Sequence, residues 1–500
     1  MGTIFRFMPS HTLLPPRMYS LIIRPRASLY LALWFTKVDV PQFVGHENEF
    51  LRPYAMIPVV QRIFYLLILL VPATAAMGQE VDWKTTVGEA VDTLQQYLRF
   101  DTTNPPGDVT EAAGFLQNIL ETEGIAVTRY EAAPGKINLS ARLKGSGDAK
   151  PILLLHHMDV VPADMSRWDP VKPFGGELKD GYIWGRGAID MKGTGVLQLY
   201  AFLTLARQKI ALDRDVIFLA VNDEEIGGTM GTRFLLDNHY EELDPEFVLD
   251  EGGFGSREIF VNGKLVFGIS VAEKRAFWLR VTARGIAGHG SQPNDHNPND
   301  KLMRALTRLF NVPFPTVSNP VLDALVTKLG KLEPNQFTNA IRQTTVSLTS
   351  LQSGVGHPAK ANVIPSLATA TLDARLLPGM DAEDFLAEVK SRLGDEIEVE
   401  VIHPASQSVV TPHDTGMFRA LSNAITRHHP DATVVPMIIP YGTDSRMFRL
   451  RGAKCYGILP LVLTTELATS IHGDAERIPV DQFETGIRIY YETLVEVAAR

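Results

Sequence analysis

A histidine and an aspartate with metal-binding spacing occur in the segment HHMDVVP. His157 and Asp159 lie two residues apart at the end of the apolar run PILLL. Side chains two residues apart on a strand point to the same side, and an imidazole beside a carboxylate is a typical metal ligand with its orienting partner. His156 points to the opposite side, and we expect it to be structural. Taken alone, this short pattern fits a polar strand end without function better than a metal site.

Three acidic residues in two glycine-containing segments extend this pattern. Asp190 lies in GRGAIDMKG directly before a helical stretch, and Glu224 and Glu225 lie in NDEEIGG directly after the apolar run DVIFLAV. Adjacent glutamates at a strand end point in different directions, so one can bind a metal ion while the other acts as general base on a water. Each segment alone also fits a structural role, a helix cap for Asp190 and a solvated turn for the glutamates.

The segments LDEGG and SIHGD supply the remaining candidate ligands. Asp250 and Glu251 follow the apolar run EFVL. Because neighbouring residues on a strand point to opposite sides, one of the two is expected to reach a metal, and the choice stays open. His472 lies between small residues in a loop. Together the two histidines and three acidic positions form a five-ligand set, which suits two zinc-like ions that each keep room for water or substrate.

Alternating strands and helices position these segments. From Trp83 onward, β-rich apolar runs alternate with helical patterns, which predicts an α/β domain with a mixed, largely parallel sheet flanked by helices. Ligands bind beyond the carboxyl ends of such strands, and three of the strands run directly into the polar segments. The sequence therefore predicts the site at that edge of the sheet.

A second pattern interrupts this domain. Strands and helices in the order β-α-β-β-α-β are expected over residues 276–403, which is the ferredoxin-like α+β order. The stretch from Val312 to Gln343 does not fit that order and is expected to be an insertion. We therefore predict a catalytic domain in two parts, 83–275 and 404–500, with the 276–403 domain inserted between them as a lid.

The N-terminal region has the pattern of a secretory signal peptide over residues 56–78. Arg62 precedes the apolar run IFYLLILLV, and small residues in PATAAMG follow it. Since signal peptides begin at the initiator methionine, Met56 is the expected start, and residues 1–55 are an over-extended N-terminus. We expect an exported, periplasmic or secreted protein without stable membrane insertion after cleavage. A membrane anchor or a buried helix is the alternative.

Composition excludes some other classes of protein. The chain has 500 residues and a formal net charge of −9, without a long basic run, so nucleic acid is not an expected partner. Its one cysteine, Cys455, cannot form an internal disulfide and lies in an apolar run typical of a buried position.

The five motifs together resemble a family of zinc-dependent metallopeptidases. HHMDVVP, GRGAIDMKG, NDEEIGG, LDEGG and SIHGD follow the order and rough spacing of the family that includes glutamate carboxypeptidase, aminoacylase, succinyl-diaminopimelate desuccinylase, carnosinase and carboxypeptidase S. The resemblance covers Trp83 to Arg500. LDEGG and the long insertion are most similar to the carboxypeptidase S and N-acyl-amino-acid amidase branch. The implied fold is zinc-exopeptidase-like.

This resemblance implies a role for each candidate metal ligand. It implies that Asp190 bridges two divalent ions, most simply zinc, with cobalt or manganese as alternatives. His157 and the acid of LDEGG would bind one ion, and Glu225 and His472 the other. Members of the family differ in the acid that they use at the LDEGG position.

The resemblance also implies catalytic and substrate-binding residues. Asp159 would orient His157, and Glu224 would be the general base. In GIAGHGSQP, His289 matches a histidine that stabilises the oxyanion, in dimeric members within the partner subunit's site. Arg446 in YGTDSRMF is a candidate to bind a substrate carboxylate, and Asn362 in ANVIP is a candidate polar contact to the substrate.

These residues predict a hydrolase that cleaves an amide or peptide bond next to a free carboxylate. Its substrate would be a small peptide or an N-acyl amino acid, cut by carboxypeptidase, dipeptidase or N-acyl-amino-acid amidase activity. The 276–403 domain is expected to support a homodimer. An alternative is an exported protein of the same fold that binds peptides or amino acids without catalysis, but such a protein would not need a Glu-Glu pair beside two histidines.

Overall fold

The computed structural model describes residues 80–315 and 317–500. The predicted N-terminal extension and signal peptide, residues 1–55 and 56–78, lie outside the described residues. Within the described part of the chain, no helix combines the length and apolarity that crossing a membrane requires.

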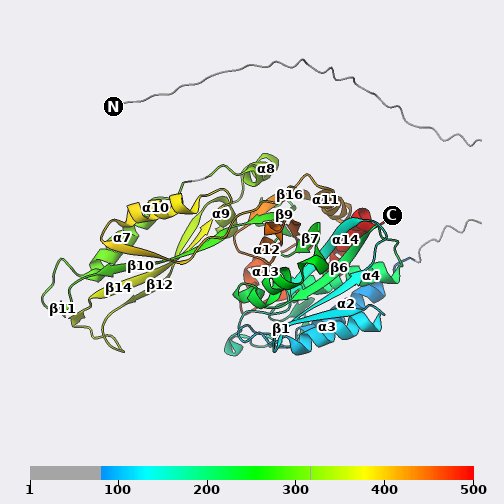
Figure 1. The fold of residues 1–500 in the computed structure, drawn as a ribbon, viewed down its shortest axis with the longest axis horizontal. Helices are drawn as coiled ribbons and strands as arrows, with labels where there is room; N and C mark the ends of the chain where they lie inside the picture. Colours follow the sequence, from blue (N-terminus) through cyan, green and yellow to red (C-terminus); the bar gives the residue numbers. More distant parts are fainter. Residues whose placement is uncertain (1–79, 316) are drawn as a thin grey trace, which may run out of the picture. The chain divides into compact units, whose positions relative to one another are not determined.

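The larger sheet is mixed and carries the polar segments on its central strands. Its strand order is β1-β2-β6-β3-β7-β17-β9-β16, and β8 pairs with β9 at the side. Figure 1 labels β1, β6, β7, β9 and β16 of this sheet. The pairs β3/β6, β3/β7, β7/β17 and β9/β16 are parallel, whereas β1/β2, β2/β6 and β8/β9 are antiparallel. The strands are β1 (Val127–Ala133), β2 (Lys136–Leu143), β3 (Ala149–His157), β6 (Arg214–Val221), β7 (Phe247–Asp250), β8 (Phe254–Ser256), β9 (Val266–Glu273), β16 (Thr433–Ile439) and β17 (Lys454–Gly457).

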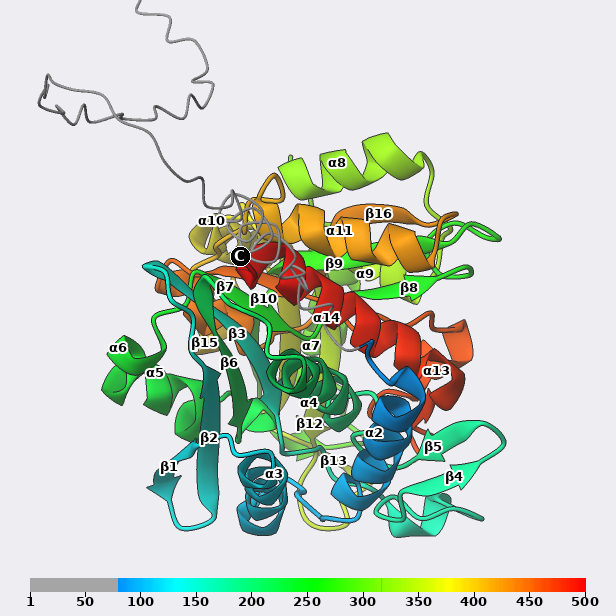
Figure 2. The same ribbon diagram turned by 90° about the vertical axis from the view of Figure 1, so that its right-hand side faces the viewer.

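Helices cover both faces of this sheet, which is why its central strands are continuous apolar runs. On β3, Ile152 and Leu154 belong to one hydrophobic core, and the alternate residues Leu153 and Leu155 belong to another. The first core also includes residues of α2 (Trp83–Tyr97), α3 (Thr110–Thr122), α4 (Lys192–Arg207), α11 (Gly416–His428) and α14 (Phe483–Ala498). The second includes residues of α5 (Phe234–Asn238), α6 (Tyr240–Leu243) and α12 (Ser445–Leu450). Figure 2 shows α2, α4 and α14 side by side. This arrangement confirms the predicted α/β fold.

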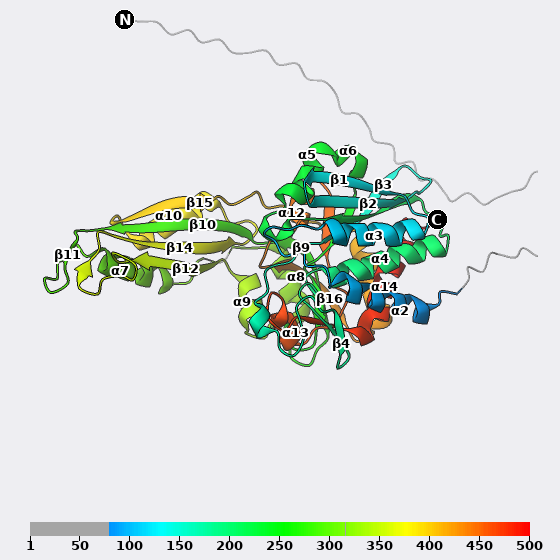
Figure 3. The ribbon, with the colours of Figure 1, turned by 90° about the horizontal axis from the view of Figure 1, so that it is seen from below.

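The inserted lid is an antiparallel sheet with two helices on one face. Its strand order is β12-β14-β10-β15, and its own core forms between the sheet and the helices. Along the chain, the order strand, helix, strand, strand, helix, strand confirms the ferredoxin-like prediction. The elements are β10 (Arg275–Arg284), α7 (Pro298–Phe310), β12 (Thr345–Ser353), β14 (Leu367–Leu376), α10 (Ala382–Leu393) and β15 (Ile397–His403). A small ribbon of β11 (Gly288–His289) and β13 (Val363–Ile364) lies at one end of the lid sheet (Figure 3).

The insertion between Val312 and Gln343 returns to the larger domain. It contains α8 (Pro320–Leu329) and α9 (Gln336–Arg342). The buried side chains Val321, Leu325 and Ile341 belong to the core of the larger sheet, not to that of the lid. Helix α8 lies along β16, the strand at one edge of that sheet, so the insertion covers an otherwise exposed edge.

Candidate active site

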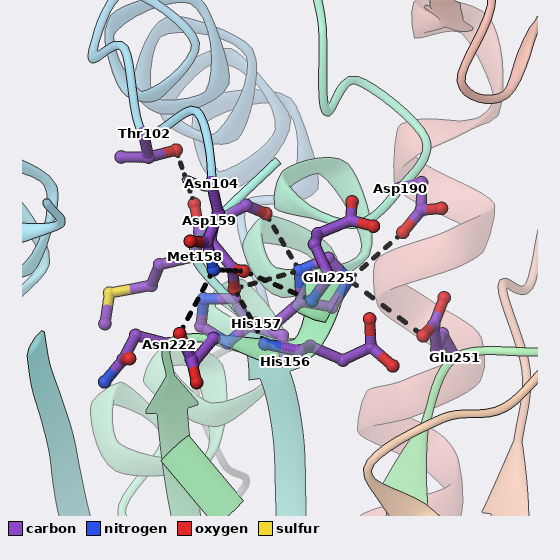
Figure 4. A network of polar contacts seen from close by, with 12 residues as sticks. Thr102, Asn104, His156, His157, Met158, Asp159, Asp190, Asn222, Glu225 and Glu251 are labelled. Carbon is purple, nitrogen blue, oxygen red and sulfur yellow. Dashed lines mark hydrogen bonds and ion pairs between the residues drawn. The ribbon is translucent and has the colours of Figure 1, made fainter. Parts of the chain in front are cut away.

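The candidate site lies where three neighbouring parallel strands end. His157 is the last residue of β3, Glu224 and Glu225 follow β6 after two residues, and Glu251 follows β7 directly. Because β6, β3 and β7 are adjacent in the sheet, their carboxyl ends bring these side chains to one edge. Asp190 joins them from the glycine-rich loop before α4. Figure 4 shows His157, Glu225, Asp190 and Glu251 converging on the same space.

Asp190 lies between the two histidines and contacts each with a different carboxylate oxygen. Its Oδ1 is 3.1 Å from His157 Nε2, and its Oδ2 is 3.0 Å from His472 Nε2. Glu251 Oε1 lies 3.9 Å from His157 Nε2, and Glu225 Oε2 lies 3.4 Å from His472 Nε2. The five side chains thus form two groups of three that share Asp190, with the ligand atoms of each group within 4.8 Å of one another.

The chemistry of these two groups fits two zinc-type ions. Each group offers three nitrogen or oxygen ligands, which is the usual number in a catalytic zinc site that keeps a position open. Glu225 Oε1 is buried without a hydrogen-bond partner among the described residues, as expected of an atom that awaits a ligand. Hydrogen bonds to Asp190 and Glu225 raise the pKa of His472 to about 10.

The two acids of LDEGG have different surroundings. Glu251 belongs to the group around His157. Asp250 is buried and points to the start of α12, where its Oδ2 accepts hydrogen bonds from Ser445 N at 3.0 Å and Ser445 Oγ at 2.7 Å. Of the two alternatives, the geometry therefore favours Glu251 as the ligand, with Asp250 as an anchor for the segment that carries Arg446.

Asp159 connects the His157 segment to the glutamate pair. His157 Nδ1 lies 2.9 Å from the backbone oxygen of Asp159 and 3.6 Å from its carboxylate, which orients Nε2 toward the metal ligands. The carboxylate accepts the backbone N–H groups of Glu224 and Glu225, both at 3.2 Å. It also accepts the side-chain amide of Asn104 at 2.8 Å. One buried residue thus holds a histidine through its backbone oxygen and both glutamates through its carboxylate.

Asn104, Lys136 and Asp223 complete this support and were not among the predicted residues. Asp223 lies in the left-handed region with φ 73°, directly before Glu224. Its carboxylate accepts hydrogen bonds from Lys136 Nζ at 2.9 Å, Asn104 Nδ2 at 3.2 Å and Met230 N at 3.0 Å. Asn104 precedes two prolines, Pro105 and Pro106, and nothing in this local sequence shows which carboxylate the asparagine contacts.

A buried ion pair joins the Asp190 loop to the His472 loop. The Glu476 carboxylate accepts Arg186 Nη1 at 2.6 Å and the backbone N–H groups of Gly187, Ile189 and Asp190 at 2.9 to 3.1 Å. Arg186 Nη2 donates to the backbone oxygen of His472 at 3.1 Å. A small sheet of β4 (Glu177–Lys179), β5 (Tyr182–Trp184) and β18 (Arg477–Pro479) holds the two loops side by side. Arg186 lies in the quoted motif GRGAIDMKG and Glu476 lies two residues after SIHGD, but only the fold shows that they meet.

A cavity of about 770 Å³ opens beside the metal ligands, within the size range of small-molecule sites. Glu224 lines it, next to the metal ligands but in neither ligand group. Burial raises the pKa of the Glu224 carboxyl well above its usual range, and nearby Asp444 and Glu225 add to the rise. This location and environment suit a general base.

Arg446 lines this cavity at the start of α12 and forms no ion pair with any described residue. Arg275 also lines the cavity without an ion pair, but its guanidinium donates to the backbone oxygens of Ser406 and Met380. Arg375, by contrast, is paired with Asp373 at 2.8 Å. The ammonium group of Lys274 donates to three oxygen atoms of the insertion and β12 at 2.8 to 2.9 Å. Of the lysine and arginine side chains that line the cavity, Arg446 is thus the one without a hydrogen-bond or ion-pair partner among the described residues.

His289 and Asn362 are neighbours, but they lie away from this cavity within the chain. β11 and β13 pair His289 with Val363, and Gly290 N donates to Asn362 O at 2.7 Å. Neither residue lines the cavity. The intervening strand β10 has ten residues, so its ends are about 30 Å apart at a rise of about 3.3 Å per residue. His289 is exposed and is thus accessible to another chain.

Comparisons with known proteins agree with this geometry. The model of the peptidase family M20/M25/M40 matches residues 153–496. Aminoacylase-1A of Rattus norvegicus is 29% identical over 418 residues, covering 82% of this chain and 95% of that protein. The N-fatty-acyl-amino acid synthase/hydrolase PM20D1 of Homo sapiens is 30% identical over 378 residues, covering 69% of this chain and 74% of that protein. The M20 family metallo-carboxypeptidase Sso-CP2 of Sulfolobus solfataricus has the same fold, with a TM-score of 0.63 at 19% identity over 81% of this chain and 98% of that one.

Proposed function

Because this chain belongs to the peptidase family M20/M25/M40, whose members are hydrolases of amide or peptide bonds, we propose that it is a dinuclear metal-dependent amidase that releases an amino acid from an N-acyl amino acid. The observation that carries the proposal is Asp190, whose two oxygens face two separate ligand groups beside Glu224. The alternative, a binding protein without catalysis, has no support among the relatives.

The proposed reaction uses the chain's residues as follows. Bound at the two groups, zinc-type ions supply Lewis-acid polarisation of the carbonyl and a reactive water at neutral pH. Arg446 binds the carboxylate of the amino-acid part and places the scissile amide near Glu224. Glu224 accepts a proton from the attacking water and later donates it to the nitrogen as the C–N bond breaks. Asp159 keeps His157 and the glutamate backbone in position throughout.

Apolar side chains in the cavity favour an acyl group over a charged peptide N-terminus. Phe254, Met447, Leu459, Leu463 and Ile471 line the cavity from the larger domain. A protonated α-amine would have to lose its hydration against such a wall, whereas an acyl chain gains from burial there. The aminoacylase and the N-fatty-acyl-amino acid hydrolase among the relatives are named for substrates of this kind.

Paired substitutions of the two glutamates test the mechanism. Glu224→Gln keeps the size of the side chain but removes the base, so kcat should fall by about 10²-fold or more while metal content is unchanged. Glu225→Gln should instead weaken metal binding, and added metal should partly restore its activity. Elemental analysis and assays with a panel of N-acyl amino acids and dipeptides measure both effects. Loss of metal in Glu224→Gln with retention in Glu225→Gln would reverse the two roles.

We further propose that the protein is a homodimer in which His289 completes the partner's site by donating to the oxyanion. Its exposed position, outside the cavity of its own chain, supports an action in trans. His289→Ala should lower kcat by about 10²-fold. Mixing His289→Ala with Glu224→Gln should restore activity, because exchanged dimers contain one intact site. No recovery in a mixture shown to exchange subunits would exclude the trans arrangement.

We also propose that zinc is the native metal and that the protein is exported. Two histidines with three carboxylates suit zinc, and cobalt and manganese are the alternatives to compare in metal reconstitution. The residues 56–78 carry the signal-peptide pattern. N-terminal sequencing of the exported protein should place the cleavage between Ala76 and Gln79, and a mature chain that retains Phe64 would indicate a membrane anchor.

A further inference from the structure

An aromatic surface occupies the helix-free face of the lid sheet. On β10, Phe277 and Leu279 belong to the lid core, so Trp278 between them points to the opposite face. Trp278 is paired in register with Asp373 on β14 and with His403 on β15. Trp278 and His403 both line the cavity that contains Glu224. The lid thus provides one wall of the active-site cavity.

Neighbouring side chains hold the Trp278 indole in one orientation. Its Nε1 donates to Asp373 Oδ1 at 3.0 Å, and Asp373 in turn accepts Arg375 Nε at 2.8 Å and Nη2 at 3.0 Å. The His403 ring lies against the indole with a centroid distance of 4.8 Å and an interplanar angle of 37°. Asp373 and Arg375 neutralise each other, so the surface is aromatic and carries no net charge from this pair.

Despite these contacts, Trp278 is 39% exposed, which is high for a large apolar residue whose ring is held by its neighbours. An aromatic side chain that is held in place loses little conformational entropy when it binds a ligand. The exposed ring is therefore prepared for an apolar partner that enters the cavity.

The position of Trp278 indicates which part of the substrate it meets. Arg446 and Trp278 line the same cavity from different domains, Arg446 at the start of α12 and Trp278 on the lid strand β10. A group that extends from the scissile bond away from Arg446 would reach the indole on the lid side and Phe254 and Leu463 on the other side.

We propose that Trp278 and His403 form a specificity-determining surface, which binds the distal part of the acyl group and gives the enzyme a preference for long apolar acyl chains. This inference rests on the proposed N-acyl-amino-acid amidase function and names residues that set its selectivity. The distal methylene groups are buried between the indole and the apolar wall of the larger domain. The acetyl group of a short substrate ends before it reaches the indole.

Binding measurements in the metal-loaded Glu224→Gln protein test this role without turnover. Calorimetry compares N-acetyl-leucine with N-octanoyl-leucine. We expect the octanoyl ligand to bind at least tenfold more tightly, and Trp278→Ala to remove about tenfold of that preference without changing the affinity for N-acetyl-leucine. Trp278→Phe should have an intermediate effect, because it keeps a ring but loses the hydrogen bond to Asp373. Leu351→Ala is the matched control, since Leu351 is 58% exposed on the lid and does not line the cavity.

An unchanged octanoyl preference in Trp278→Ala, or no preference in the parent protein, would overturn the proposal. If the unchanged preference came with an altered discrimination between N-acetyl-phenylalanine and N-acetyl-alanine, the surface would instead bind the amino-acid side chain. If the native protein hydrolyses no N-acyl amino acid but Trp278→Ala still loses the octanoyl preference, the amidase function fails and the acyl-binding surface stands.

Discussion

Replacing Glu476 by glutamine should damage the metal site through a residue that binds no metal. The Glu476 side chain is completely buried and accepts four hydrogen bonds, one from Arg186 and three from the backbone of the Asp190 loop. In the Glu476→Gln variant the side chain keeps one oxygen acceptor, and its NH₂ group replaces the other oxygen. That NH₂ group then faces an N–H donor with which it cannot form a hydrogen bond. It also leaves the Arg186 guanidinium, which is 1% exposed, without its counter-charge.

The expected magnitudes follow from this burial. Breaking a buried ion pair from one side costs about 3–5 kcal/mol of the free energy of unfolding, because the remaining charge stays desolvated. Since Asp190 N is one of the donors and Arg186 also holds His472 O, the ligand geometry should loosen. Loss of a partner that orients metal ligands typically weakens metal affinity about 10- to 100-fold.

Chelator competition measures the metal affinity, and urea unfolding of the metal-free protein measures the stability. Glu466→Gln is a matched control, because Glu466 pairs with Arg477 at 2.7 Å but its side chain is 78% exposed. That exposed pair should contribute about 1 kcal/mol or less. If Glu476→Gln bound metal as tightly as the native protein, the ion pair would not be what positions Asp190.

Three further predictions follow from buried groups. Burial lowers the pKa of Lys274 to about 7, and the nearby charge of Arg375 adds to the effect. Above pH 7 the unfolded chain therefore binds more protons than the folded chain, so the free energy of unfolding rises with pH. Urea unfolding between pH 7 and 9 should show this rise, up to about 1.4 kcal/mol per pH unit, and Lys274→Met should lack it. If the free energy of unfolding changed with pH equally in both proteins, Lys274 would not be the group responsible. Chelation should lower the melting temperature, because three carboxylates then repel one another, and zinc should restore it; a melting curve unaffected by chelator would argue against bound ions. Asp159→Ala should reduce both kcat and metal affinity, since it removes the carboxylate that holds the backbone N–H groups of Glu224 and Glu225, whereas unchanged kcat and metal affinity would show that this carboxylate does not position the glutamates.

The strands and most site residues could be predicted because their signals are local. The run PILLLHH has the length and β-branched neighbours of a buried strand, and its alternation places His157 and His156 on opposite faces. Burial lowers the pKa of His156 to about 3, which agrees with the structural role expected of it. The choice between Asp250 and Glu251 could not be made from sequence, because alternation shows only that they diverge, and the partner Ser445 is 195 residues away.

The supporting residues were missed for a related reason. Arg186 and Glu476 are 290 positions apart, and no spacing rule connects them. The segment TMGTRFLLDNHYEEL has the apolar spacing of one continuous helix, but the structure has a short π-helical turn followed by α5 and α6. Two left-handed glycines, Gly227 and Gly228, precede that turn and carry the chain back over Asn222. Periodicity reports which residues are buried, but not where tertiary contacts bend the backbone.

The insertion has a consequence for how the protein can be dissected. The chain passes between the larger sheet and the lid four times, at Lys274, between α7 and α8, between α9 and β12, and after β15. Because α8 and α9 supply side chains to the larger core, part of that core is encoded within the lid's own stretch of sequence. A gene truncated to the two catalytic segments would expose β16 and yield an aggregation-prone product. Limited proteolysis should release the lid only when the larger domain also unfolds. The lid and the larger domain should therefore be expressed and degraded as a single unit.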